Sequence, residues 1–312
     1  MNARLIMTVE EMQNHEAWLG MRNKGIGGSD AGVIMGDNQW KSKYQLWLEK
    51  TGQARPEDIS QKEPVYWGNI LEAPVANRFV ELTGKKVRKA GMMQNKNDPW
   101  MLANVDRLII GEKAGLECKT TNAFSVKEWQ EDNLPDGYYW QCQHYMMCTG
   151  LPVWYIAVLI GGQHFEYKAV PRCDADIEAL YDAERTFWDV NVKSGIAPDI
   201  DGSASTTAAL QDQYAECNGS AIELPNEAAV ILQILDNFTE QEKAVKKAIQ
   251  EQKNKLCAML GDNEVGFVGE RKVTWKMQNG RVTVDSKKLK TAFPDIYQQV
   301  VKQGKPLRVF RA

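Results

Sequence analysis

Residues 104–119 read NVDRLIIGEKAGLECK, and this stretch organises the chain. Two short apolar runs within it are separated by a polar segment that begins with glycine, which predicts a β-hairpin with Asp106 at its entry. Because side chains alternate along a strand, Glu117 and Lys119 are expected on one face and Cys118 on the other. The hairpin therefore predicts two carboxylates and an ammonium at one spot.

The spacing D-x(10)-E-x-K suggests a particular chemistry. Carboxylate oxygens are ligands that Mg²⁺ prefers, and such an ion makes water a better nucleophile near neutral pH. A lysine beside it can position that water or offset charge on phosphorus. The pattern thus predicts metal-assisted phosphodiester hydrolysis. A solvated strand face that happens to carry Glu and Lys is the alternative explanation.

Composition limits the classes of protein that remain. The 312 residues, 43% hydrophobic and 25% charged, are typical of a globular protein with one large or two smaller domains. No apolar run approaches the roughly 20 residues needed to cross a bilayer, so we expect a cytoplasmic protein without membrane contact. The six cysteines form no C-x-x-C, and the three histidines are scattered. Zinc and iron–sulfur sites are therefore disfavoured, and any metal should have oxygen ligands.

Charge divides the chain unevenly. Residues 243–312 contain 16 Lys and Arg against 6 Asp and Glu, whereas residues 1–242 contain 22 against 35. A Ser- and Thr-rich segment at 203–207 marks a linker. We therefore expect one domain at 1–205 and an extension at 206–312. A solvated basic surface explains the charge of the extension, and a role facing DNA is compatible with it.

The extension should hold a long helix, a hairpin, a short helix and a basic tail. Apolar residues over 231–259 recur at steps of three and four, interrupted by Glu242 and Gln252. This spacing is typical of a helix that packs on one partner. The turn signal Gln278-Asn279-Gly280 predicts the hairpin.

A second feature precedes the hairpin at 104–119. Arg22 leads into a glycine-rich segment at 25–28, followed by Ser29, Asp30 and an apolar run. This order predicts a tight loop and a helix start, where free backbone N–H groups can hold a phosphate. Arginine can bind a terminal phosphate with two parallel hydrogen bonds. Helix capping without any ligand is the alternative.

Other polar residues have open roles. Pro74 is acceptable only in the first turn of a helix, which places Glu72 near a helix start. Glu72 there either complements the helix dipole or, if it faces Asp106, adds a third carboxylate. Gln141 and Gln143 lie in an expected helix, where they either face solvent or hydrogen-bond a phosphate or a metal-bound water.

Taken in order, these motifs resemble the phage-type alkaline exonucleases, meaning the YqaJ viral recombinase family and its relative lambda exonuclease. The resemblance covers about residues 15–190. It implies an α/β (α+β) fold with a restriction-endonuclease-like PD-(D/E)xK core, a mixed β-sheet flanked by helices. Residues 206–312, with their C-terminal helix and β-hairpin extension, are additional to the lambda form, and Val105 stands where the family motif has proline. The motifs are Arg22 with Gly27-Gly28-Ser29-Asp30, Trp67-Gly68 with Glu72, Asp106, Glu117-Cys118-Lys119, and Gln141-Cys142-Gln143-His144-Tyr145.

The resemblance also implies an activity. Such enzymes use Mg²⁺, with two ions in the site and Mn²⁺ as a substitute, to hydrolyse linear double-stranded DNA processively from 5′ ends. They leave 3′ single-stranded overhangs for recombination by strand annealing. The implied partners are DNA ends, a single-strand annealing protein and further copies of the chain in a ring-shaped trimer. The implied setting is the cytoplasm of a bacterial host, with a phage or prophage origin.

Carried over by motif, each site residue has an implied role. Asp106, Glu117 and the Cys118 carbonyl would bind Mg²⁺, and Glu72 would hold metal directly or through water. Lys119 would orient the attacking water. The remaining residues would support the site or contact the 5′ phosphate and DNA: Gln143 for support, and Arg22, Ser29 and Gln141 for the DNA contacts.

Two other functions use the same residues. A structure- or sequence-specific endonuclease of the same fold would share the metal chemistry but cut internally. A non-catalytic DNA-end or partner-binding module would share the fold alone. For the extension we consider a subunit contact, a DNA contact or a docking surface for the annealing protein.

Overall fold

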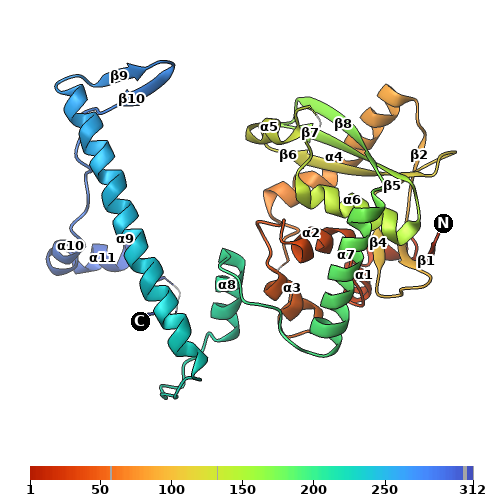
Figure 1. The fold of residues 1–312 in the computed structure, drawn as a ribbon, viewed down its shortest axis with the longest axis horizontal. Helices are drawn as coiled ribbons and strands as arrows, with labels where there is room; N and C mark the ends of the chain where they lie inside the picture. The colour runs from red at the N-terminus through yellow and green to blue at the C-terminus, as the bar shows by residue number, and fades with distance from the viewer. Residues whose placement is uncertain (57, 132, 305–307, 312) are drawn as a thin grey trace. The chain divides into compact units, whose positions relative to one another are not determined.

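The computed structural model describes residues 1–56, 58–131, 133–304 and 308–311, and the chain forms two compact units, Met1–Tyr214 and Ala215–Ala312 (Figure 1). The first unit extends nine residues beyond the expected boundary at 205. Helix α8 (Ala204–Gln213) belongs to it because Ala209 is buried in the core and Tyr44 Oη of α3 (Lys43–Lys50) donates a 2.7 Å hydrogen bond to Gln213 Oε1.

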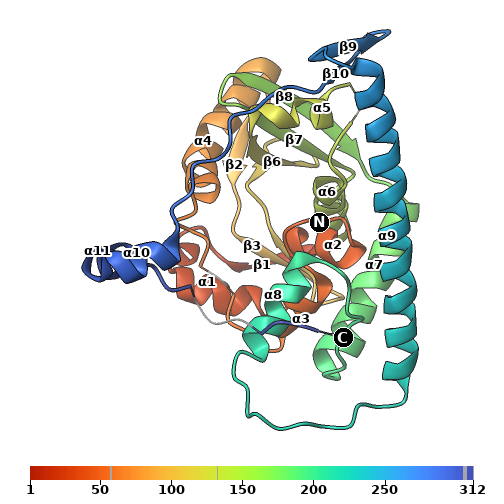
Figure 2. The ribbon, with the colours of Figure 1, turned by 90° about the vertical axis from the view of Figure 1, so that its left-hand side faces the viewer.

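A five-stranded mixed sheet forms the centre of the first unit (Figure 2). Its strands in spatial order are β2 (Val87–Lys89), β5 (Arg107–Ile109), β6 (Ala114–Thr121), β7 (Val153–Ile160) and β8 (His164–Pro171). Strands β6 and β7 run parallel, and the other neighbours run antiparallel. The predicted hairpin is present as β5 and β6, and Gly111 in its turn has a φ of 86°, which suits glycine.

Helices cover both faces of this sheet. Even-numbered residues of β6, such as Leu116, pack with Phe79 of α4 (Glu63–Thr83) on one face. On the other face, Trp154 and Ile156 of β7 lie in the core that also holds Met146 of α6 (Asp136–Thr149). The predicted mixed β-sheet flanked by helices is thereby confirmed.

A smaller antiparallel sheet and several helices complete the unit. The sheet has the order β1 (Ala3–Met7), β3 (Met92–Asn95) and β4 (Leu102–Asn104). The remaining helices are η1 (Glu11–Gln13), α1 (His15–Arg22), α2 (Gly28–Met35), η2 (Ala123–Ser125), α5 (Val126–Trp129) and α7 (Asp174–Thr186), which continues as the π-helix η3 (Phe187–Lys193).

The expected position of Pro74 is wrong. Helix α4 begins at Glu63, so Pro74 lies inside the helix rather than in its first turn, and Glu72 lies mid-helix. A proline in a helix interior removes one hydrogen bond to the carbonyl four residues earlier. Burial of Val75 and Phe79 against the sheet offsets that cost, which the local pattern did not reveal.

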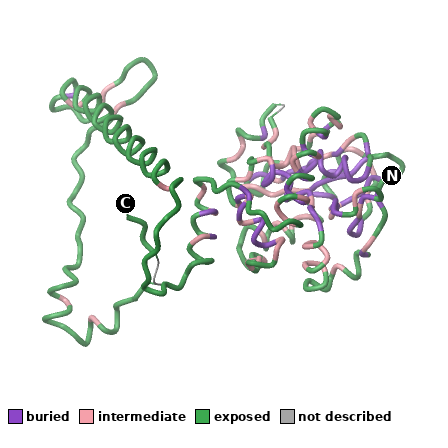
Figure 3. Tube along the Cα trace, turned by 60° about the horizontal axis from the view of Figure 1, so that its bottom comes forward, coloured by how far each residue is buried: buried purple, intermediate pink, exposed green. Residues whose placement is uncertain are grey.

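The second unit differs from the first in burial. Its elements are α9 (Glu227–Leu260), β9 (Val265–Val268), β10 (Arg271–Thr274), α10 (Ser286–Ala292) and α11 (Pro294–Val300). Leu260 is the one buried residue that the structure describes in this unit, as the almost uniformly exposed trace in Figure 3 illustrates. None of the helices formed by the described residues of the chain has the length and apolar character needed to span a membrane.

Two expectations for this unit need correction. The hairpin turns at Gly269, whose φ is 59°, and not at Gln278-Asn279-Gly280. A short hairpin closes there because glycine supplies the left-handed conformation, whereas Met277, 92% exposed, finds no packing surface. The segment before the basic tail forms two short helices, α10 and α11, instead of one.

A buried ion pair fixes α2 against α3 in the first unit. Lys50 Nζ lies 2.8 Å from Asp30 Oδ2, and both side chains are at most 5% exposed. The N–H of Gly27 donates to the same carboxylate at 3.0 Å, and the Arg22 guanidinium lies 3.6 Å from its other oxygen. Burial alone would raise the pKa of Asp30, but the Lys50 and Arg22 charges hold that pKa well below its ordinary value of 3.8.

We expect Asp30→Asn to lower the free energy of unfolding by about 3–5 kcal/mol at pH 7, because it leaves the Lys50 ammonium buried without a counter-charge. A carboxyl with a depressed pKa stabilises the fold fully above its ordinary pKa and loses that effect as the pH falls below it. Urea denaturation should therefore show a smaller difference from the parent at pH 3 than at pH 7. Asp212→Asn, at an exposed position of α8, is the control; an equally small effect of both variants at pH 7 would contradict the assignment.

Candidate active site

Strand β6 presents Glu117 and Lys119 on the face covered by α6. Lys119 Nζ lies 2.6 Å from Glu117 Oε1 and 4.9 Å from the centre of the Tyr138 ring. Cys118 points to the opposite face and packs beside the α4 core. Burial by itself would favour a neutral amine, but the carboxylate charge of Glu117 leads the interactions that raise the pKa of Lys119 above its ordinary value. Lys119 is therefore an ammonium at neutral pH.

Asp106 reaches the same place from the bend between β4 and β5. The backbone N–H of Cys118 donates a 2.7 Å hydrogen bond to Asp106 Oδ2, which fixes the carboxylate beside β6. Burial first, and then the neighbouring charge of Glu117, raise the pKa of Asp106 well above its ordinary value. The structure thus brings together Asp106, Glu117 and Lys119.

Glu72 is close by but differently engaged. Its Oε1 accepts a 2.5 Å hydrogen bond from Arg107 Nη1, and its charge acts on Asp106 only as a weaker influence. Arg107 follows Asp106 in the chain, and its guanidinium is 6% exposed. The Glu72 carboxylate therefore lies near the other two but is paired with Arg107. The sequence motifs do not predict this arginine at the site.

Gln141 supports the carboxylates from α6. Its Nε2 donates to Glu117 Oε1 at 2.7 Å and to Tyr145 Oη at 2.9 Å, and Tyr145 Oη donates to the Asn104 carbonyl at 2.8 Å. The sequence motif predicts a DNA contact for Gln141 and no role for Tyr145, whereas the structure places Gln141 against Glu117. Residues four apart lie on one helix face, so this spacing was the signal that would have found the pair.

Gln143 lies elsewhere, although we expected it to support the site. It is fully buried, its Nε2 donates to the Pro171 carbonyl at 2.9 Å, and its Oε1 accepts from the Cys173 N–H at 3.1 Å. Both of its polar atoms therefore hold the end of β8 and the start of α7. Two residues along a helix rotate a side chain by about 200°, which turns Gln143 away from Glu117.

Two observations show how a divalent cation would fit. Glu117 Oε2 is buried and has no hydrogen-bond partner, so a ligand oxygen is left without compensation. Removal from water and then the negative charge of Glu117 raise the pKa of Asp106, and a cation beside the two carboxylates would relieve both effects. Within the described part of the chain, no group of three or more His, Cys, Asp or Glu side chains could hold a metal. The protein thus offers two carboxylates, an arrangement that suits Mg²⁺ because Mg²⁺ keeps several water or phosphate ligands.

The start of α2 forms the second part of the site. Arg22 Nη2 donates a 2.5 Å hydrogen bond to Ser29 Oγ, and Ser29 lies in the first turn of the helix. A Cβ on Gly28 would lie 2.5 Å from the Tyr145 ring and 3.1 Å from Gln141 Cγ, so glycine permits this close approach. The helix start and the carboxylates therefore share one support on α6. Free N–H groups at a helix start, with an arginine beside them, suit a phosphate.

The two glutamines of α6 give a direct test. Gln141→Ala removes the donor that orients Glu117, and loss of such a partner typically weakens metal affinity about tenfold to hundredfold. Gln143→Ala leaves the Pro171 carbonyl and the Cys173 N–H unpaired, which costs about 1–3 kcal/mol of stability, and should leave metal affinity unchanged. Calorimetric titration with Mn²⁺ and thermal denaturation measure the two effects. The reverse pattern would show that the support comes from Gln143.

Comparisons with known proteins place the chain in a family. Residues 17–152 match the model of the YqaJ-like viral recombinase domain. The chain is 42% identical over 307 residues to the uncharacterized protein YqaJ of Bacillus subtilis (strain 168), which covers 96% of this chain and 95% of that protein.

Solved structures with a similar fold are more distant. An alkaline exonuclease, LHK-Exo, from Laribacter hongkongensis has a TM-score of 0.48 at 18% identity, covering 58% of this chain and 93% of its own. A putative exonuclease from Eubacterium rectale has a TM-score of 0.45 at 14% identity, covering 71% of this chain and 96% of its own. The family follows from the sequence match across nearly the whole length of both proteins: the chain belongs to the YqaJ family.

Proposed function

We propose that this chain is a divalent-metal-dependent exonuclease that degrades linear double-stranded DNA from its 5′ ends and leaves 3′ single-stranded overhangs for strand annealing. The observation that carries the proposal is the cluster of Asp106, in the bend before β5, with Glu117 and Lys119 of β6, in which a buried Glu117 oxygen lacks a partner. Membership of a family with a viral recombinase domain supports the same activity.

The carboxylates define where a metal would sit. Asp106 and Glu117 would hold Mg²⁺, or Mn²⁺ as a substitute, together with the backbone carbonyl of Cys118. When bound, such ions act as Lewis acids that make water a better nucleophile near neutral pH and offset charge on the phosphate. Glu72 would join a second ion only after releasing Arg107, because the two side chains form an ion pair.

Lys119 and Gln141 do the positioning. The Lys119 ammonium lies beside Glu117, where it can orient a water by hydrogen bonding and offset negative charge that develops on phosphorus. Gln141 holds Glu117 Oε1, and Oε2, which has no hydrogen-bond partner, would be the oxygen available to a metal. These are electrostatic roles, so they depend on the exact placement that β6 and α6 impose.

Arg22 and Ser29 would hold the terminal 5′ phosphate. A terminal phosphate carries more free oxygens and charge than an internal one, and Arg22 already directs its guanidinium at Ser29 on the first turn of α2. Gln141 of α6 donates to Glu117 and also lies against Gly28 at the start of α2, so the held end and the scissile bond would keep a fixed separation. That arrangement would favour removal of nucleotides from an end.

The resemblance to phage-type exonucleases supports three further parts of the proposal. The enzyme would work as a ring-shaped trimer, would digest processively because the ring encloses its product strand, and would deliver that strand to a single-strand annealing protein. Light scattering with and without DNA measures the mass of the assembly and so tests the trimer directly.

Lys119→Ala should slow digestion of an end-labelled duplex with Mg²⁺ by roughly 100-fold or more, because it removes a preorganised charge at the reaction centre. The control is Lys86→Ala, at an exposed position next to β2. Digestion by the Lys119 variant at the parent rate would remove this residue from the mechanism.

The same assay separates the competing activities. Covalently closed circular duplex should stay intact, whereas an endonuclease would cut it. Chelation with EDTA should stop digestion and added Mg²⁺ should restore it, whereas a non-catalytic binding module would show no digestion under either condition. Labels on the 5′ and 3′ strands of one duplex report the direction of digestion.

Arg22→Ala should reduce the preference for 5′-phosphorylated over 5′-hydroxyl ends by about tenfold or more, since a hydrogen bond to a charged group contributes about 1.5–3 kcal/mol. Ser29→Ala should act in the same direction while leaving the contact of Arg22 with Asp30 in place. Arg4→Ala, at an exposed position on β1, is the control. Equal rates on both kinds of end in the parent would exclude a phosphate site here.

A further inference from the structure

Helix α9 carries an exposed apolar stripe with an unusually regular repeat. Its members alternate in steps of four and three over four heptads, and they are 38% to 81% exposed: Ile231, Leu235, Phe238, Val245, Ile249, Leu256 and Met259. Glu242 and Gln252 fill the two remaining positions of the same stripe. A strict seven-residue repeat over this length is the pattern of a coiled coil, whereas a helix on a globular surface follows a 3.6-residue period.

The second unit also lacks a core of its own. Leu260 is the one buried residue among those that the structure describes there, although α9 alone contains 34 residues. A segment of this size becomes stable only when its apolar face is covered. The stripe is therefore a contact surface, and the pattern of its residues identifies what covers it.

We propose that α9 pairs with α9 of a second copy of this chain in an antiparallel coiled coil centred on Lys247. From Leu235 to Met259 the stripe is symmetric about that residue, because each position on one side has a counterpart at the same distance on the other; only Ile231 lies beyond the paired part. The resulting layers pair Leu235 with Met259, Phe238 with Leu256, Glu242 with Gln252, and Val245 with Ile249, each across the two copies.

The polar layer selects this direction. In the antiparallel register the Gln252 amide of one copy can donate to the Glu242 carboxylate of the other, so the two polar seam residues satisfy each other. Each Glu242 also keeps its 2.7 Å contact with Lys246 of its own helix. An in-register parallel pair would instead place two Glu242 side chains against each other, and like charges in a seam are unfavourable.

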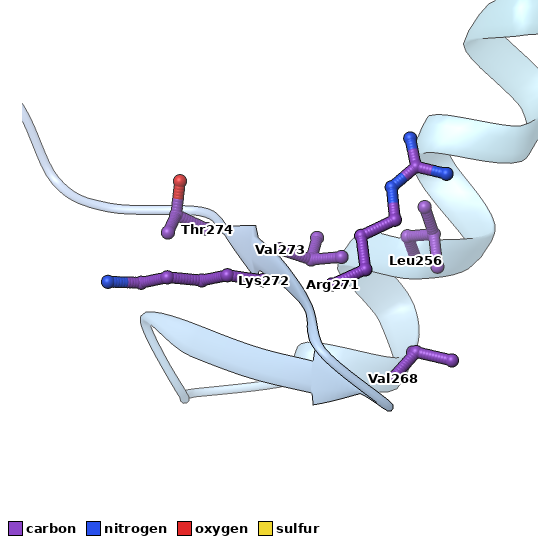
Figure 4. A pocket seen from close by; sticks show the side chains of 6 residues that line it. All are labelled: Leu256, Val268, Arg271, Lys272, Val273 and Thr274. Carbon is purple, nitrogen blue, oxygen red and sulfur yellow. The ribbon is translucent and has the colours of Figure 1, made fainter.

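A cavity beside Leu256 supplies an independent match. The hairpin β9–β10 and the end of α9 enclose a hollow of about 510 Å³ (Figure 4). Its lining combines the apolar side chains of Leu256, Val268 and Val273 with those of Arg271, Lys272 and Thr274. Phe238, which is 62% exposed, is the bulkiest member of the stripe. The antiparallel register places Phe238 of the second copy opposite Leu256, at the hollow. Because the contact is two-fold symmetric, Phe238 of each copy lies at the hollow of the other copy.

This contact is independent of the proposed nuclease activity. It uses the second unit, whereas the residues proposed for catalysis lie in the first.

Disulfide trapping in the full chain tests the register. In a Cys217→Ser, Cys257→Ser background, Val245→Cys combined with Ile249→Cys should give a covalent dimer on mild oxidation, because these positions face each other across copies. Val245→Cys alone should not. In the antiparallel pair the two cysteines at position 245 would be offset by four residues, about 6 Å along the helix axis. With the distance between the two helices added, their separation exceeds the reach of a disulfide.

A second measurement covers the case in which the cysteine variants misfold. By light scattering, Phe238→Glu should halve the mass of the assembly, and Lys247→Glu, on the outer face of α9, should not. A dimer trapped by Val245→Cys alone would show a parallel pair and overturn the proposal. Absence of any trapped dimer, with an unchanged mass for Phe238→Glu, would show that the stripe is covered by other surfaces and would overturn it as well.

Discussion

The arrangement of the first unit depends on one unfavourable juxtaposition, the partly buried Asp106 carboxylate beside the buried Glu117 carboxylate. Two like charges removed from water repel each other, and each loses hydration. The fold offsets this with three donors that converge on the pair: the Lys119 ammonium, the Cys118 N–H and the Gln141 amide. The compensation is incomplete, because one oxygen of Glu117 remains without a partner. Because the protein donors compensate the negative charge of the carboxylates only in part, the site is suited to a cation.

The supporting elements explain why this pair is held so firmly. Strand β6 lies between β5 and β7 in the sheet, with helices on both faces, so its side chains have little freedom. Helix α6 links the carboxylates to the start of α2 through Tyr145, which touches Gly28 there. The buried pair of Asp30 and Lys50 then fixes α2 against α3. The same helices therefore support both the stability of the fold and the candidate site. A substitution that alters activity should also be tested for its effect on the free energy of unfolding.

The second unit follows a different principle. The first unit buries a continuous core around its sheet, whereas the second exposes nearly all of its apolar side chains along one long helix. Such a helix specifies its partner through the strict heptad spacing of its apolar residues and not through packing with surrounding helices and strands. Glu242 and Gln252 lower the stability of a coiled-coil interface, but they select the direction and the register in which the two helices pair.

The sequence alone determined the features that depend on neighbours in the chain. Strand alternation placed Glu117 and Lys119 together and Cys118 apart, and glycines with a strand pattern on either side marked the hairpin at Gly111. Tertiary structure decided what depends on packing between distant segments. It selected Gln141 rather than Gln143 because only one of the two helix faces meets β6, and it paired Glu72 with Arg107 because α4 packs on β6, the neighbour of β5 in the sheet. Local spacing fixes the direction of a side chain relative to its own element, but which element faces it is settled only when the whole core is buried.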